Sequence, residues 1–139
     1  MAAATAARVT DEKALGPLRR YLMKASTTFY AGTLVCLNSD GLAVAPAALT
    51  GNQGCVGVCV ADVTSAATGD SFVQVREGTF KLAATSVADT SVGLVVYATD
   101  NQTVDETDAG NRPKAGYLQE VVSSTSCWVA VGLGHHQAA

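Results

Sequence analysis

Four cysteines have the broadest chemical range in this chain, because thiols form disulfides, bind zinc and act as nucleophiles. They are Cys36, Cys55, Cys59 and Cys127. Cys55 and Cys59 lie four residues apart in an expected strand, which separates them by roughly 13 Å, beyond the reach of a disulfide. A strand also lacks the tight turn on which zinc ribbons hold their ligands. We therefore expect buried free thiols, and Cys36 and Cys127 would pair only if their strands were neighbours, which a reducing compartment disfavours.

Two adjacent histidines, His135 and His136, are the other candidate bases or metal ligands. They follow the last expected strand, in a C-terminal tail where no neighbouring group is expected to orient an imidazole. Nucleophilic catalysis needs a base that a third group holds in place. We therefore expect no catalytic residue, no cofactor, no metal site and no enzymatic activity, and a small hydrolase is the last-ranked interpretation.

Four carboxylates gather in one expected loop, at Asp100, Asp105, Glu106 and Asp108. Clustered oxygen ligands can bind calcium, but the spacing lacks the D-x-D-x-D-G pattern of an EF-hand loop. A solvated acidic loop is the simpler interpretation. The glycines at positions 132 and 134 do not indicate a phosphate-binding loop, because no helix follows them.

The elements that would position these side chains are best recognised from the central run Cys55 to Leu82, which contains three strand signals in succession. Residues 56–60 alternate valine with small residues, which indicates a strand covered on both faces. Residues 72–76 and 79–82 continue the alternation of apolar and polar side chains. Glu77-Gly78 between them predicts a tight turn, because glycine readily adopts positive φ.

Other strand patterns surround the central run and complete one domain of 139 residues. They occupy residues 33–37, 42–46, 94–98, 103–105, 115–122 and 127–132. The first two flank Asn38-Ser39-Asp40-Gly41, which predicts a hairpin. No segment has the period of a long amphipathic helix, and residues 83–93 allow one helical turn at most. The pattern predicts an all-β fold, a small antiparallel β-barrel or sandwich.

Charge divides the chain into an N-terminal arm and a body. Residues 1–28 contain five Lys or Arg and two Asp or Glu residues, a net charge of +3, whereas the remainder contains four and ten, a net charge of −6. We expect an extended or flexible arm at 1–28, a β-rich body at 29–132 and a tail at 133–139. Within the arm, residues 18–24 fit either a strand or an extended segment. A basic arm beside an acidic body favours contact with another copy or with a second acidic surface.

The amino-acid composition indicates which kinds of partner the chain could bind. Only 15% of the residues are charged, which suggests that a partner covers part of the surface. The body has no basic stripe with interleaved aromatic residues, so we expect no direct nucleic-acid binding. No apolar run has transmembrane length, and the N-terminus lacks the basic region of a secretory signal, so we expect no membrane contact and synthesis in the cytoplasm.

The order of the segments resembles the capsid cement, or head decoration, proteins of tailed bacteriophages. The resemblance spans about Phe29 to Val131 and rests on Glu77-Gly78-Thr79-Phe80-Lys81-Leu82 followed by Gly93-Leu94-Val95-Val96-Tyr97. The most characteristic piece runs from Val96 to Val104. The longer N-terminus and the four cysteines depart from the simplest members.

This resemblance implies a β-tulip-like fold and a structural role. Such proteins form homotrimers on the outer capsid surface of the virion, after synthesis in the host cytoplasm, and bridge neighbouring major capsid subunits at local three-fold axes. An N-terminal arm often adds backbone hydrogen bonds to a capsid strand. The expected capsid contacts here are Arg8, Lys13, Arg19, Arg20, Tyr21 and Lys24. The alternative is a virion-surface module that recognises a host glycan, which exposed aromatic residues would favour.

Overall fold

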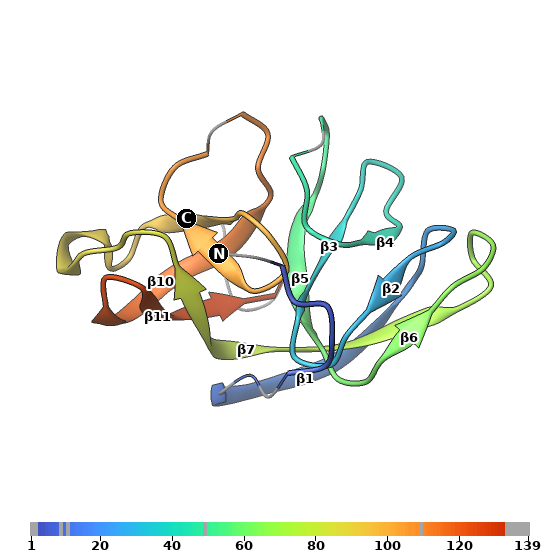
Figure 1. Cartoon of the computed structure of the whole chain (residues 1–139), viewed down its shortest axis with the longest axis horizontal. Helices are drawn as coiled ribbons and strands as arrows, with labels where there is room; N and C mark the ends of the chain where they lie inside the picture. The colour runs from blue at the N-terminus through green and yellow to red at the C-terminus, as the bar shows by residue number, and fades with distance from the viewer. Residues whose placement is uncertain (1–2, 9, 11, 49, 109, 133–139) are drawn as a thin grey trace.

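The computed structural model describes residues 3–8, 10, 12–48, 50–108 and 110–132, with the backbone alone for residues 12–17 (Figure 1). The described chain is nearly all β, as the alternation predicts. The strands are β1 (Glu12–Leu22), β2 (Thr28–Phe29), β3 (Leu34–Leu37), β4 (Ala43–Val44), β5 (Gly54–Cys59), β6 (Val63–Thr64), β7 (Phe72–Ala84), β8 (Val95–Ala98), β9 (Thr103–Asp105), β10 (Lys114–Ser123) and β11 (Ser126–Val131). One turn of 3-10 helix, η1 (Asp89–Ser91), precedes β8.

Five of these strands close a small barrel. The ring runs β7, β11, β10, β8 and β9 and returns to β7, with antiparallel pairs except for the parallel pair of β7 and β9. Its interior, called the barrel core below, also takes side chains from β3, β4 and β5. The barrel core comprises Leu34, Cys36, Val44, Cys55, Val58, Phe80, Leu82, Ala84, Val87, Val96, Ala98, Val104, Ala115, Leu118, Cys127, Val129 and Val131. The sequence left a barrel and a sandwich open, and the structure is a barrel with additional strands.

The remaining strands extend the sheet from the first half of β7. β5 pairs with β7, β3 with β5 and β4 with β3, while β1 pairs with the opposite edge of β7. The sheet curls until Met23, just after β1, bridges to Ala43 of β4. A second core fills this part and is capped by the pair of β2 and β6. The second core comprises Met23, Phe29, Val35, Leu37, Ala43, Val56, Cys59, Val73 and Val75.

β7 belongs to both cores, and its buried face changes along its length. Val73 and Val75 point into the second core, whereas Phe80 and Leu82 point into the barrel core. The change occurs at Glu77-Gly78, where the sequence predicted a tight turn. That prediction is wrong, because strands on both edges of β7 pair with Gly78 and keep the chain extended.

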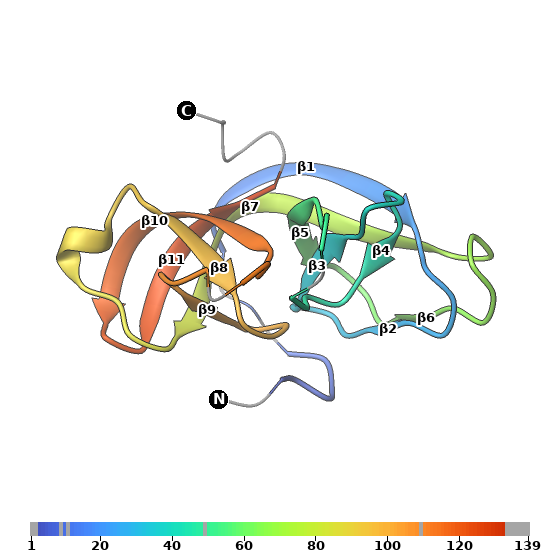
Figure 2. The same cartoon turned by 90° about the horizontal axis from the view of Figure 1, so that it is seen from above.

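The extended N-terminal arm is not confirmed. Residues Glu12–Leu22 pair with β7 instead, and β1 and β7 lie side by side beneath both halves of the molecule (Figures 1 and 2). The segment before β1 also contacts the body, since the amide of Arg8 donates to the carbonyl of Ala31 at 2.7 Å. Residues 12–22 form this strand because they pair with β7 from Phe72 to Phe80, and Tyr21 on the inner face packs against the second core.

Local predictions succeed elsewhere. β3 and β4 form the expected antiparallel hairpin, with Gly41 at φ 77° in its turn. β8, β9, β10 and β11 fall within the expected strand segments or extend them by one or two residues. The tail at 133–139, with His135 and His136, lies outside the described residues.

Candidate functional site

An exposed, partly apolar surface covers the outer face of β1 and the first half of β7. Residues directly opposite in an antiparallel pair point to the same face. The register places Leu18 opposite Arg76, Arg20 opposite Gln74 and Leu22 opposite Phe72. Val60, which directly follows β5, joins this surface, because its amide donates to the carbonyl of Gln74 at 3.1 Å. We call Leu18, Arg20, Leu22, Val60, Phe72 and Gln74 the β1–β7 outer surface.

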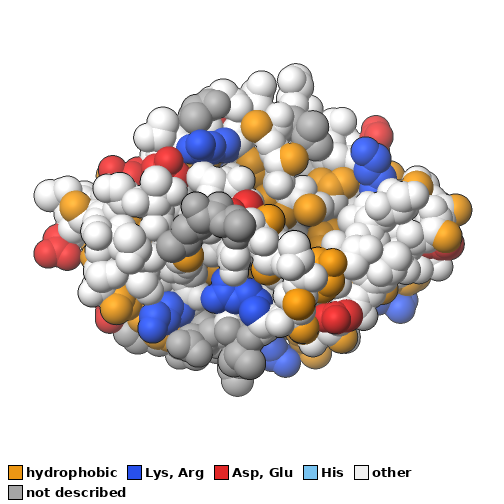
Figure 3. Space-filling view, in the orientation of Figure 1, with side chains coloured by type: hydrophobic (Ala, Val, Ile, Leu, Met, Phe, Trp, Pro, Cys, Tyr) orange, Lys and Arg blue, Asp and Glu red, His pale blue; other side chains and the backbone are white. Residues whose placement is uncertain are grey.

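Large apolar side chains stay in contact with solvent on this surface. Leu18 is 48% exposed, Leu22 41% and Phe72 48%. The guanidinium carbon of Arg20 lies 4.4 Å from the centroid of the Phe72 ring, a cation–π arrangement that fixes both side chains. In the view of Figure 3, several Lys and Arg side chains lie along the lower part of the molecule, where Figure 1 places β1 and β7. Apolar area rimmed by fixed positive charge is typical of a protein-binding surface.

Arg19, beside Arg20 in sequence, points to the opposite face of β1. Its Nε donates to Oε2 of Glu77 at 2.6 Å. The Glu77 side chain is 0% exposed and that of Arg19 is 50% exposed, so the ion pair joins a buried carboxylate to a half-solvated cation. Gly132 makes room for Glu77, because a Cβ on Gly132 would lie 2.4 Å from Glu77 Cγ. The pair therefore fastens β1 to the body.

The other predicted capsid-contact residues occupy different environments. Tyr21 packs against the second core, and burial, followed by the charge of Glu77, raises the pKa of its hydroxyl. Lys24 follows β1 and is exposed. Arg8 lies in the N-terminal segment, where its Nη1 donates to Oε1 of Gln102 at 3.0 Å. Lys13 lies in β1, and its side chain is outside the described residues.

The structure thus brings Arg20 and Lys24 to the exposed side of the chain, pairs the half-exposed Arg19 with Glu77 on the other face of β1, and packs Tyr21 against the second core. It adds four apolar residues that the sequence analysis did not select, namely Leu18, Leu22, Val60 and Phe72. The available signal was the two-residue spacing of Leu18, Arg20 and Leu22. In a strand, this spacing places both leucines on the same face as Arg20.

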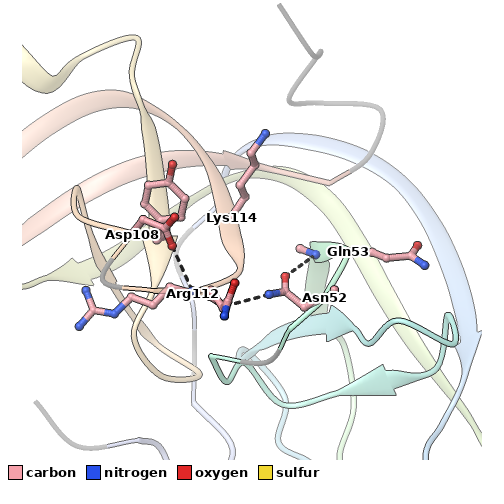
Figure 4. Close-up of a pocket in the computed structure, with 9 residues that line it drawn as sticks. Asn52, Gln53, Asp108, Arg112 and Lys114 are labelled. Atoms are coloured by element: carbon pink, nitrogen blue, oxygen red, sulfur yellow. Dashed lines mark hydrogen bonds between the residues drawn. The ribbon is translucent and has the colours of Figure 1, made fainter.

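A polar pocket of about 400 Å³ lies between residues 51–54 and 108–114 (Figure 4). Asn52 holds its two sides together, since Nδ2 donates to the carbonyl of Asn111 at 2.9 Å while Oδ1 accepts from the amide of Gly54 at 3.0 Å. Gln53 and Arg112 extend in opposite directions in Figure 4. Arg112 donates to Oδ2 of Asp105 at 3.1 Å. The polar side chains therefore stabilise two loops rather than converge on one point.

The four cysteines are buried, as expected, and no disulfide joins them in the structure. Cys127 lies opposite Leu82 on one side and Val121 on the other, so its strand does not neighbour that of Cys36. Burial raises the pKa of the Cys127 thiol to about 11. In the described part of the chain, no group of three or more His, Cys, Asp or Glu residues is placed to hold a metal ion.

No helix among the described residues combines the length and the apolar character needed to cross a membrane. Comparisons of the chain with protein-family models, with curated proteins and with solved structures found no match.

Proposed function

We propose that this chain is a structural virion protein that decorates and stabilises a phage capsid. In this role it forms a homotrimer on the outer capsid surface and bridges neighbouring major capsid subunits at local three-fold axes. The observation that supports the proposal is the β1–β7 outer surface, where exposed Leu18, Leu22 and Phe72 flank Arg20. The resemblance of segments 77–82 and 93–104 to cement proteins is independent of that surface.

The surface suits a capsid partner for energetic reasons. Burial of apolar area is the main favourable contribution to most protein–protein association, and the part that exceeds the entropy cost of association contributes to affinity. Arg20 and Lys24 attract an acidic partner and orient its approach, which affects the association rate more than the final affinity. Among the described residues, no strand pairs with the outer edge of β1 between Leu18 and Leu22. That edge can add backbone hydrogen bonds to an extended capsid segment.

The test is binding of purified protein to expanded heads of the phage whose genome encodes the chain. Wild-type protein is expected to sediment alone at three times the 14.1 kDa mass of one chain, and to co-sediment with heads. Phe72→Ser is expected to weaken head binding at least tenfold, because loss of a buried aromatic contact typically costs at least 1.4 kcal/mol. Unchanged folding by circular dichroism confirms that the variant tests the surface.

Leu94→Ser is the matched control, since Leu94 is exposed but lies outside the β1–β7 outer surface. It is expected to bind heads as wild type does. Failure of the wild-type protein to bind the heads would refute the proposal. Equal binding by Phe72→Ser and Leu94→Ser would show that another surface makes the contact.

Recognition of a host glycan is the rival function, and the polar pocket is where it would occur. Sugar sites combine convergent hydrogen-bonding groups with an exposed aromatic face. Here Gln53 and Arg112 diverge, and Asn52 is engaged in joining the loops. A glycan array gives the direct comparison: a hit that Gln53→Ala abolishes would favour this function over capsid binding.

A further inference from the structure

Cys36 of β3 and Cys55 of β5 lie directly opposite each other in the sheet. Their Sγ atoms are 2.6 Å apart. A covalent disulfide requires about 2.05 Å between sulfurs and Cβ atoms about 3.8 Å apart, so side chains on directly paired residues need little movement to bond. The two backbones already have the relative position that a cross-strand disulfide uses.

The surroundings of the pair are apolar and closed. Cys36 is 1% exposed and Cys55 is 0% exposed, and both belong to the barrel core. Burial, reinforced by the hydrogen bond with Cys55, raises the pKa of the Cys36 thiol well above its usual value. The Cys36 thiol is therefore slow to react while the sheet is intact, because the thiolate is the nucleophile, and both sulfurs are shielded from solvent.

The remaining cysteines lack this geometry. Cys59 points into the second core, and its Sγ donates to the carbonyl of Ala61 at 2.9 Å. Cys127 faces Leu82 and Val121 in its two strand pairs rather than another cysteine. Cys36 and Cys55 are therefore the two cysteines that the fold places close enough to bond.

We infer that Cys36 and Cys55 form a cross-strand disulfide when the protein folds in the presence of a small-molecule disulfide such as oxidised glutathione. One thiolate attacks the glutathione disulfide and releases one reduced glutathione, giving a mixed disulfide. The second thiolate then attacks the protein sulfur of that intermediate and releases the other reduced glutathione. The two cysteines lose two protons and two electrons in total, and one glutathione disulfide becomes two thiols.

The bond would join β3 to β5 and close a loop that contains β4 and one side of the polar pocket. Closing a loop of roughly 20 residues restricts the unfolded chain, which stabilises the folded state. For a domain of this size, the melting temperature is expected to rise on the order of 10 °C. The inference does not depend on capsid binding.

The experiment is refolding of the full chain in a glutathione redox buffer, followed by alkylation of the free thiols and digestion at aspartate. Cleavage before Asp40 and Asp62 separates Cys36, in residues 11–39, from Cys55 and Cys59, in residues 40–61. Trypsin is unsuitable, because no Lys or Arg lies between Lys24 and Arg76. Without reductant, the two aspartate peptides are expected to appear as one linked species with a mass lower by two hydrogens.

Single alanine variants identify the bonded residues. Cys36→Ala and Cys55→Ala are expected to abolish the linked species, and Cys59→Ala and Cys127→Ala to retain it. Reductant is expected to remove the rise in melting temperature of wild-type protein. Four alkylated thiols after oxidative refolding, or a link that survives Cys55→Ala, would overturn the inference; the wild-type digest decides even if a variant fails to fold.

Discussion

Replacing Arg19 by methionine removes its guanidinium while keeping an unbranched side chain of similar reach. It therefore isolates what the ion pair with Glu77 contributes to stability. The Arg19 Nε to Glu77 Oε2 distance is 2.6 Å, and the Glu77 side chain is 0% exposed. The carboxylate cannot gain full hydration when its cation is removed, unless β1 separates from β7.

The size of the effect follows from the burial of each partner. Breaking a fully buried ion pair costs about 3–5 kcal/mol, and an exposed pair contributes about 0–1 kcal/mol. Arg19 is 50% exposed, so water already screens part of the attraction. Glu77 also keeps a further interaction within the protein. We therefore expect Arg19→Met to lower the free energy of unfolding by about 2 kcal/mol, within the range for hydrogen bonds to charged groups.

Urea unfolding followed by circular dichroism measures this change. With a denaturant slope of roughly 2 kcal/mol/M, the midpoint is expected to fall by about 1 M. Arg20→Met is the matched control, because Arg20 is the next residue in the same strand and lies over the exposed ring of Phe72 instead. Loss of an exposed cation–π contact costs at most about 1 kcal/mol.

A double variant tests the pairing itself. Adding Glu77→Gln to Arg19→Met removes the unpaired charge and is expected to recover part of the stability, with a coupling energy of about 1 kcal/mol or more. If Arg19→Met costs no more than Arg20→Met, the buried carboxylate does not depend on Arg19 and the reasoning is refuted.

Three further changes have defined outcomes. Gly132→Ala is expected to lower the unfolding free energy by at least about 2 kcal/mol in urea, because its Cβ would lie 2.4 Å from Glu77 Cγ; an unchanged midpoint would contradict this packing. Burial raises the pKa of the Cys127 thiol to about 11, so the unfolded chain loses its proton first. Stability is then expected to fall between about pH 8.5 and pH 11, less steeply in Cys127→Ser; equal slopes would refute this. Asp70→Ala removes the acceptor for the backbone amides of residues 66–67 and is expected to speed their hydrogen exchange, whereas unchanged rates would show that these bonds are dispensable.

The sequence predicts the local part of the fold. The hairpin of β3 and β4 follows from one turn signal that ends in Gly41, because the strands and the turn are adjacent in the chain. The parallel pair of β7 and β9 has no such signal, since it depends on how the barrel closes. Glu77-Gly78 resembles a turn locally, and pairing with β1 and β11 on its two edges overrides that tendency.

In the candidate site too, the sequence predicts local features but not those that depend on pairing between distant strands. Composition and charge single out the N-terminal basic residues, but they do not say which face each occupies. That depends on the register between β1 and β7, which turns Arg19 towards Glu77 and Arg20 towards Phe72. The closeness of Cys36 and Cys55 likewise depends on the pairing of β3 with β5.

The position of β7 in both cores has a consequence for folding during synthesis. Every strand that lines the second core lies at or before β7, whereas β8, β9, β10 and β11 all follow it. The second core can therefore assemble while the ribosome has yet to complete the barrel. The later half of β7 then lacks its partner β11, whose Val129 pairs with Phe80, until β11 has been synthesised. Such distant pairings form slowly, so we expect barrel closure to be the last step and to leave one edge of β7 open to chaperones until it occurs.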